Sequence, residues 1–330
     1  MSYRWFSRRL KTESRHCGRN EIIYEAITFE SEIRPAVSKR FPVPAERSST
    51  VKLLVVTDLE GVAGIDSFSQ TRTGREEQKG GAMDQLAREV NAAIAGVRSS
   101  APEAEIDVWD GHGSGGLRKA DLEGAKYLRE GRPYFHLDEY NGMMFIGQHA
   151  MAGTPDATLC HTYSSLAVDY YKLNDIFVGE FACRALLAGR QGVPTIFLSG
   201  DDKAVLEAKQ FVPEIETVAT KYGTGVESAR HCDRVEVCMA IRRGAHEAVN
   251  RLDEIPPYTG ISPPYSLEIR YYEPAKISKI DRGAGWLRKY FPPLREILPI
   301  ATGVTRIDSR TIRIAVDDIL DPESGIYTRL

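Results

Sequence analysis

Acidic side chains that could bind metal ions follow the first strongly apolar run of the sequence. Asp58 and Glu60 come directly after Lys52 to Thr57, and residues two positions apart in an extended chain project to the same side. Gly61 then allows the chain to turn sharply. Taken alone, this Asp-x-Glu-Gly stretch is more typical of a polar turn than of a metal site.

Two histidines occupy equivalent places farther along the chain. His112 ends Trp109-Asp110-Gly111-His112, and His149 ends Gly147-Gln148-His149, each after a predicted strand. Four of the seven histidines fall within fifty positions: His112, His136, His149 and His161. Because imidazole and carboxylate together suit zinc and related divalent ions, the joint pattern favours a metal site over isolated histidines.

Glu180 adds a third acid near the start of an Ala- and Leu-rich segment predicted to be helical over 178–188. An acid in the first helical turn is also favoured by the helix dipole, which is a sufficient explanation for Glu180 alone. Three carboxylates and two histidines, however, carry enough negative charge for two nearby dications, and one carboxylate can bridge them. The set therefore predicts a two-metal centre.

The elements that must position these side chains alternate between strand and helix. The apolar runs predict strands at 52–57, 106–109, 143–146 and 195–198, and helices at 83–97 and 178–188. Later segments predict a helix at 235–252 and strands at 267–272 and 311–316. We therefore expect an α/β fold with a mostly parallel sheet flanked by helices, a site at the carboxyl ends of its strands, and a smaller α+β lobe towards the C-terminus.

Three segments are predicted: a basic N-terminal extension over 1–50, a metal-binding catalytic α/β domain over 51–232, and the smaller lobe over 233–330. The net charge of -3 and pI near 6.2 predict neither a nucleic-acid nor a membrane partner. No apolar run is long enough to cross a membrane, and the start lacks the apolar core of a secretory signal. We expect a cytoplasmic protein.

Short motifs follow one another in a distinctive order from Lys52 to Asp318. They are Thr57-Asp58-Leu59-Glu60-Gly61, Asp110-Gly111-His112, Gly147-Gln148-His149-Ala150, Thr154-Pro155, His161, Asn174-Asp175 with Val178-Gly179-Glu180, and Gly200-Asp201-Asp202. In this order and approximate spacing the chain resembles the M55 metallopeptidases, the D-aminopeptidase family. Each motif is short, but their ordered combination is specific.

This resemblance implies two zinc ions per subunit, with Asp58 as the bridging ligand. Glu60 and His149 would complete the ligands of one ion, and His112 and Glu180 those of the other. The same oxygen and nitrogen ligands can accept manganese or cobalt.

The resemblance also assigns a catalytic role to His161, either as nucleophile or as acid or base. It implies a zinc-dependent aminopeptidase that hydrolyses short peptides or amides at a free N-terminus, with D-amino-acid substrates of the D-alanine type expected. It further implies a homo-oligomer, a ring-like decamer that encloses its active sites.

Three further acids are candidates for supporting roles. Asp110 could fix the orientation of the His112 ring, or it could form the turn before Gly111. Asp201 and Asp202 follow the fourth predicted strand, where they could orient ligands or bind a substrate ammonium group. A turn stabilised by aspartate hydrogen bonds explains them equally well.

Two other functions fit parts of the pattern. A dinuclear site could hydrolyse another amide or a phosphoester, but the glycine-rich stretch 111–116 lacks the Lys-Ser or Lys-Thr of a phosphate loop. The chain could also be a metal-binding regulatory or scaffold protein whose Arg-rich start contacts a partner. Every position of the matched motifs is present, so we favour catalysis.

Overall fold

The structure is a computed structural model that describes residues 50–129, 133–134, 136–274 and 304–321. All described residues belong to one unit of the chain, Pro44–Leu330. The predicted basic extension over 1–50 therefore lies outside the described residues except for Thr50.

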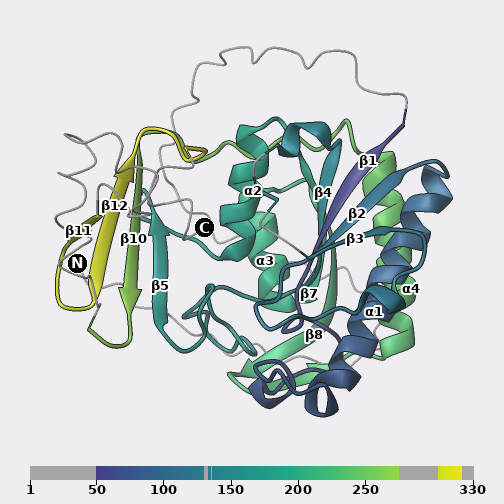
Figure 1. Cartoon of the computed structure of the whole chain (residues 1–330), viewed down its shortest axis with the longest axis horizontal. Helices are drawn as coiled ribbons and strands as arrows, with labels where there is room; N and C mark the ends of the chain where they lie inside the picture. Colours follow the sequence, from purple (N-terminus) through teal and green to yellow (C-terminus); the bar gives the residue numbers. More distant parts are fainter. Residues whose placement is uncertain (1–49, 130–132, 135, 275–303, 322–330) are drawn as a thin grey trace, which may run out of the picture. The chain divides into compact units, whose positions relative to one another are not determined.

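Sheet A has seven strands in the order β3-β2-β1-β4-β7-β8-β9 (Figure 1). Its strands are β1 (Lys52–Thr57), β2 (Glu105–Asp110), β3 (Lys126–Leu128), β4 (Gly142–Gln148), β7 (Thr195–Asp201), β8 (Glu216–Gly225) and β9 (Ser228–His231). Neighbours pair in parallel from β3 to β8, and β9 is antiparallel to β8. This confirms the predicted mostly parallel sheet.

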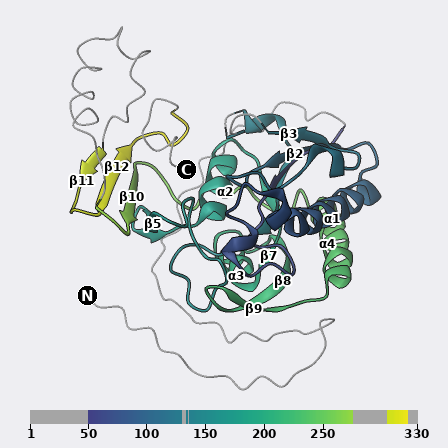
Figure 2. The same ribbon diagram turned by 60° about the horizontal axis from the view of Figure 1, so that its bottom comes forward.

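Helices cover both faces of sheet A, as a sheet of buried apolar strands requires. They are α1 (Glu76–Ser100), α2 (Glu180–Arg190), α3 (Asp202–Phe211) and α4 (Arg234–Asn250). Figures 1 and 2 show α1 and α4 side by side on one face and α2 and α3 on the other. The helices predicted at 83–97, 178–188 and 235–252 correspond to α1, α2 and α4. None of the helices in the described ranges has the length and apolarity needed to span a bilayer.

Sheet B is antiparallel, with the strand order β11-β12-β10-β5-β6. Its strands are β5 (Val168–Leu173), β6 (Ile176–Phe177), β10 (Tyr265–Tyr271), β11 (Val304–Arg306) and β12 (Thr311–Val316). Tyr265, Leu267 and Ile269 of β10 are buried and alternate with more exposed residues, the pattern of a sheet covered on one face. The predicted strands at 267–272 and 311–316 are β10 and β12.

Short 3-10 helices connect some of these elements: η1 (Phe68–Gln70), η2 (Lys119–Asp121) and η3 (Leu137–Glu139). Contacts cross the predicted division between residues 232 and 233. The helix α4 packs against α1, and β5 pairs with β10 in sheet B. The division therefore stays a prediction, and it does not separate one sheet from the other.

Candidate metal centre

The predicted ligands lie where neighbouring strands of sheet A end. Asp58 follows β1, His112 lies just after β2, and His149 follows β4. Because β1 pairs in parallel with both β2 and β4, these three ends lie at the same edge of the sheet. Glu180 is the first residue of α2.

Two glycines allow the segments after β1 and β4 to touch. The Gly61 N–H donates to the Gly147 carbonyl at 2.8 Å, and a Cβ on Gly61 would lie 1.9 Å from the carbonyl oxygen of Gln148. Gly147 has φ +80°, and a Cβ there would lie 2.1 Å from the carbonyl oxygen of Asp58. This close backbone contact holds Asp58 next to His149.

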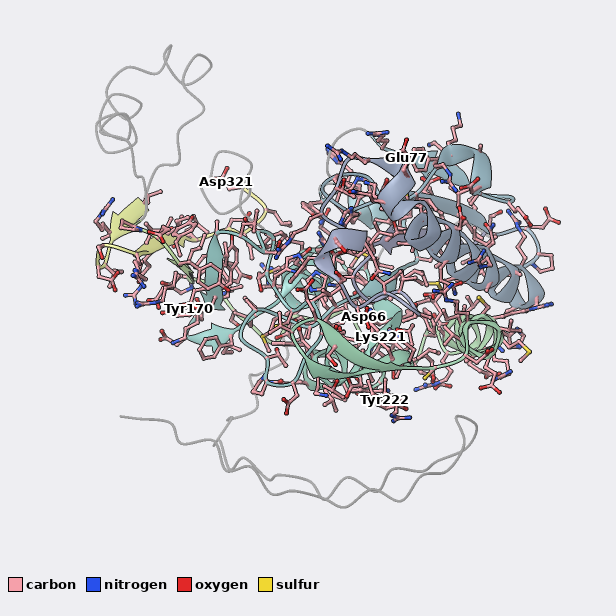
Figure 3. The ribbon with its side chains drawn as sticks, turned by 90° about the horizontal axis from the view of Figure 1, so that it is seen from below. Asp66, Glu77, Tyr170, Lys221, Tyr222 and Asp321 are labelled. Carbon is pink, nitrogen blue, oxygen red and sulfur yellow. The ribbon has the colours of Figure 1, made fainter. Side chains whose placement is uncertain are left out.

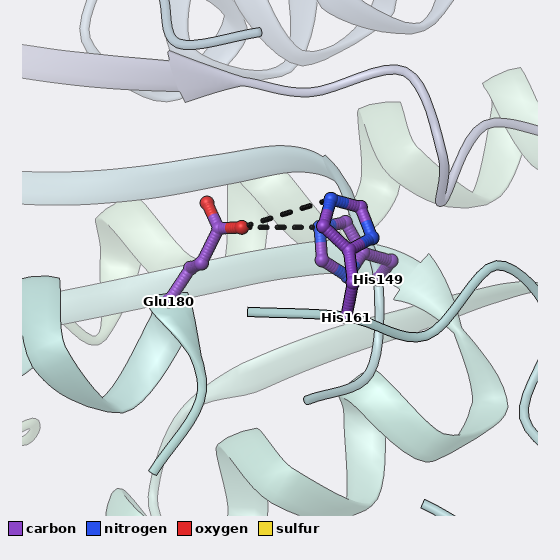
Figure 4. A group of neighbouring side chains, drawn as sticks. All are labelled: His149, His161 and Glu180. Carbon is purple, nitrogen blue, oxygen red and sulfur yellow. Dashed lines mark ion pairs between the residues drawn. The ribbon is translucent and has the colours of Figure 1, made fainter. Parts of the chain in front are cut away.

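Asp58, His149, His161 and Glu180 form a buried cluster that we call the inner group. Nε2 of His149 lies 3.5 Å from Oδ2 of Asp58 and 3.4 Å from Oε1 of Glu180. Nε2 of His161 lies 4.0 Å from the same glutamate oxygen (Figure 4). The two imidazole rings stack, with centroids 3.9 Å apart and an interplanar angle of 12°.

Main-chain carbonyls fix the orientation of both inner histidines. Nδ1 of His149 lies 2.9 Å from the carbonyl of Ala150, and Nδ1 of His161 lies 2.8 Å from that of Leu159. A carbonyl only accepts, so each Nδ1 carries the hydrogen. Each Nε2 then faces the carboxylates, which is how proteins orient histidine ligands.

Glu60 and His112 form a second contact, which we call the outer pair. Nε2 of His112 lies 3.3 Å from Oε1 of Glu60. Burial opposes a charged imidazole, but the Glu60 carboxylate outweighs it and raises the pKa of His112 to about 9. The same contact holds the pKa of Glu60 well below its usual value against the effect of burial.

The polar atoms of this cluster fit a cation. Nε2 of His149 and Oε2 of Glu60 are buried and have no hydrogen-bond partner within the described residues. Burial, with the neighbouring Glu60 carboxylate, raises the pKa of Asp58 to about 6. Crowded carboxylates and an unpartnered imidazole nitrogen are unfavourable in a protein interior, and a bound dication would satisfy both.

Within the described part of the chain, two sets of three residues could each surround one ion. They are Asp58, Glu60 and His149, and His149, His161 and Glu180. The first set is the one implied by the family resemblance. The second shares only Glu180 with the ligands that the resemblance assigns to the other ion, since it contains His149 and His161 in place of Asp58 and His112, and His112 instead contacts Glu60. The assignment of individual ligands to each ion therefore stays a prediction.

Arg184 was not predicted, although it lies one helical turn after Glu180. Its Nη2 lies 2.8 Å from Oε2 of Glu180, while Oε1 of Glu180 accepts a 2.9 Å hydrogen bond from the Tyr163 N–H. Arg184 also donates from Nε to the Tyr134 hydroxyl at 3.0 Å. These contacts fix the carboxylate of Glu180 in one orientation.

A buried lysine holds the loop that carries Glu60. Nζ of Lys221 donates to three carbonyl oxygens of this loop, those of Glu60, Val62 and Ile65. Lys221 belongs to β8 and is fully buried, whereas its neighbour Tyr222 is partly exposed (Figure 3). Burial lowers the pKa of Lys221 to about 8. No sequence signal identified Lys221, because it is distant from the loop along the chain.

The loop that carries His112 is held by Asp110 and Lys79. The Asp110 carboxylate accepts from the N–H groups of Gly116 and Leu117 at 3.0 and 3.2 Å. Nζ of Lys79 donates to the Ser114 carbonyl at 2.8 Å. Asp110 thus closes the loop that carries His112, which fits the turn-forming role considered from the sequence. Among the described residues it makes no direct contact with His112, so its effect on the orientation of that ring is indirect.

Asp201 and Asp202 lie beside the centre rather than in it. Asp201 caps α3 and accepts from the Ala150 N–H at 3.0 Å, which holds the residue that follows His149. Asp202 accepts from the Gly223 N–H at 2.9 Å and pairs with Lys203. Asp201 therefore caps a helix and also holds the chain next to His149, so both roles considered from the sequence fit its contacts. Neither Asp201 nor Asp202 lines the cavity described next.

A cavity of about 530 Å³ opens over the cluster, a volume suited to a small ligand. Its wall includes six of the candidate site residues: Asp58, Glu60, Asp110, His112, His161 and Glu180. Three arginines also line it: Arg72, Arg129 and Arg184. The chain between His161 and Glu180 contributes β5 and β6 to sheet B, so two site residues flank this pair of strands.

The chain is similar to known D-aminopeptidases in sequence and in fold. A sequence model of the M55 peptidases, described as D-aminopeptidase, matches residues 51–285. The D-aminopeptidase of Bacillus subtilis (strain 168) is 25% identical over 241 residues, which cover 71% of this chain and 86% of that protein. The solved structure of the Zn-dependent D-aminopeptidase DppA from Bacillus subtilis, described as a self-compartmentalizing protease, matches with a TM-score of 0.69 and 22% identity, covering 84% of this chain and 96% of that one. This structural match supports the fold.

Proposed function

The chain belongs to the M55 peptidase family, and we propose that it is a zinc-dependent aminopeptidase that hydrolyses short peptides or amides at a free N-terminus. We propose substrates of the D-alanine type, because the matched family and the Bacillus subtilis relative are both described as D-aminopeptidases.

One observation carries the metal-dependent chemistry. The carboxylates of Asp58, Glu60 and Glu180 line the cavity, and the buried cluster they belong to contains two polar atoms without a hydrogen bond to the described residues, His149 Nε2 and Glu60 Oε2. We propose that Asp58, Glu60, His112, His149 and Glu180 hold two zinc ions. Bound zinc would supply Lewis acidity for the scissile carbonyl and for a water molecule.

His161 is the group that we assign to proton transfer. Burial, together with the neighbouring His149, lowers the pKa of His161 to about 4, so its ring is neutral near pH 7. Its Nδ1–H is committed to the Leu159 carbonyl, and the ring lines the cavity. A neutral imidazole can accept a proton from the attacking water and pass it to the leaving amine.

We also propose a cytoplasmic homo-oligomer, with a decameric ring as the specific hypothesis. The described self-compartmentalization of DppA supports assembly, and an enclosed chamber would restrict access to short peptides. Measuring the mass of the assembly in solution tests the decamer independently of activity.

Activity is tested by incubating metal-free and zinc-restored protein with matched D-alanine and L-alanine dipeptides and aminoacyl amides. We expect zinc-dependent, D-selective release of amine that disappears in His161→Ala. Release without stereochemical preference would discard the D-specificity. Zinc binding without release from any substrate would instead favour another amide substrate or the regulatory alternative.

A further inference from the structure

The three arginines that line the cavity have different surroundings. Arg184 is buried, and its Nη2 and Nε contact Glu180 and Tyr134, which holds the Glu180 carboxylate in place. Arg129 follows β3, is exposed, and has no hydrogen bond or ion pair with the described residues. Arg72 is also exposed, but its guanidinium group is fixed in place. We therefore ask what Arg72 is positioned to bind.

Two kinds of contact fix the Arg72 side chain. Nε donates to Oγ of Ser165 at 2.9 Å, and Nη2 donates to the Ser165 carbonyl at 3.3 Å. The guanidinium carbon lies 3.3 Å from the centroid of the Phe68 ring, which in turn packs edge-on against His161 with centroids 6.2 Å apart. Among the described residues, Nη1 has no hydrogen-bond partner. A pre-ordered guanidinium group thus keeps donors available at the cavity wall beside the proposed catalytic histidine.

The charge of the loaded cavity indicates what those donors would bind. Its wall contains four carboxylates: Asp58, Glu60, Asp110 and Glu180. Two dications would balance them, so the three guanidinium groups would leave the cavity with an excess of positive charge. A ligand group that is both anionic and planar would be favoured, and arginine matches the geometry of a carboxylate.

We propose that Arg72 is a specificity-determining residue that binds the C-terminal carboxylate of a short peptide substrate, with Arg129 adding positive charge to the same cavity. The inference rests on the aminopeptidase activity proposed above and narrows its substrates to short peptides with a free carboxylate. A peptide whose C-terminus is an amide places a neutral group beside Arg72 and gains no charge-assisted hydrogen bond.

The test compares D-Ala-D-Ala with its C-terminal amide, using zinc-loaded wild type, Arg72→Gln and Arg75→Gln. Arg75 is a matched control because it is exposed on the same segment and lies outside the cavity. We expect wild type to prefer the free acid. Arg72→Gln should lower kcat/KM for the free acid by about 10- to 100-fold, mainly through KM, with little change for the amide. Arg75→Gln should match wild type, and Arg72→Lys should recover part of the preference.

The proposal would be overturned if Arg72→Gln lowered kcat/KM equally for the free acid and the amide while zinc content and thermal stability stayed unchanged. It would also be overturned if the wild-type enzyme hydrolysed the acid and the amide equally well. If wild type hydrolyses only the L-alanine substrates, the L-alanine dipeptide and its C-terminal amide are compared in the same way. Hydrolysis of neither D- nor L-alanine substrates by wild type would reject the proposed function itself, an outcome distinct from lost discrimination between acid and amide.

Discussion

The inner group and the outer pair are held in different ways. Glu180 begins a buried helix and is fixed by Arg184, while the two inner histidines are oriented by adjacent main-chain carbonyls. Glu60 and His112 instead lie on loops that are held by buried charged side chains from distant parts of the chain, chiefly Lys221 and Lys79.

This difference indicates that a buried ionisable residue near a metal centre need not bind the metal or take part in catalysis. Lys221, Glu89 and Lys79 are buried close to the ligand loops, yet their described contacts are with loop backbone or with residues that support it. Changes in the proposed ligands should therefore affect metal binding directly. Changes in Lys221 or Lys79, which hold the loops of the outer pair, should affect loop stability first and metal binding only through it.

The largest effect is expected for His149→Ala, because His149 belongs to both sets of residues that could surround an ion. Zinc content should fall sharply, and activity should drop by about 10³-fold or more. His112→Ala should retain the ion bound by Asp58, Glu60 and His149 and lose zinc only in part. Metal analysis of purified His149→Ala and His112→Ala checks this. Equal zinc loss in the two variants would contradict the expected difference between these residues.

A large loss of stability is expected for Lys221→Met, which keeps the length of the side chain and removes its charge. Three loop carbonyls would lose their buried donor, and we expect the free energy of unfolding to fall by about 3 kcal/mol. Urea unfolding of the metal-free protein measures it. Thr224→Val, at an exposed site on the same strand, removes only an exposed hydroxyl contact with Ser228 and serves as a control. An unchanged unfolding midpoint in Lys221→Met would show that the loop needs no such support.

A smaller effect is expected for Lys79→Met. The Ser114 and Gly115 carbonyls would lose a donor, so the loop carrying His112 should loosen and the unfolding free energy should fall by about 1 to 2 kcal/mol. Zinc titration should show weaker binding of the ion that uses His112, while the ion bound by Asp58, Glu60 and His149 stays bound. If both zinc ions bound more weakly to the same degree, the binding of the two ions would not be independent.

A pH-dependent effect is expected from Glu89, whose carboxylate accepts from the Ala63 N–H at 2.9 Å. Burial raises the pKa of Glu89 from 4.5 to about 7. Between these pH values the folded protein holds a proton that the unfolded chain releases, so the stabilising contribution is present below pH 4.5 and is lost as pH rises through about 7. Relative to wild type, Glu89→Gln should gain about 2 to 3 kcal/mol of stability between pH 5 and pH 8. Unfolding curves at both pH values measure the difference, and parallel pH profiles would contradict it.

The sequence predicted the parallel core because β1, β2, β4 and β7 are apolar runs buried in a sheet. It did not predict β8, since that strand contains the charged Lys221 and lacks a continuous apolar run. It also missed α3, because the capping residue Asp201 has the same sequence pattern as an aspartate in a turn.

Candidate ligands could be proposed because each closes a short local motif, four of them just after a strand and Glu180 at the start of a helix. Their supports could not be, since Lys221 and Glu60 are joined by a hydrogen bond across 161 positions. The roles of the individual ligands also depend on distances that spacing does not give. The side-by-side position of Glu60 and His112 is one such case.

The place of β5 and β6 between His161 and Glu180 has a consequence for the order in which the site forms during synthesis. Strand β5 pairs with β10, so the segment joining these two site residues lacks its neighbouring strand until Tyr265–Tyr271 has been made. Pairing of such distant strands is slow, because the loop between them must close first. A ribosome-bound chain ending before β10 would already contain every proposed ligand, yet the connection between His161 and Glu180 would remain unpaired. Strands β5 and β10 contribute no ligand, yet we expect their pairing to determine when the metal centre is completed.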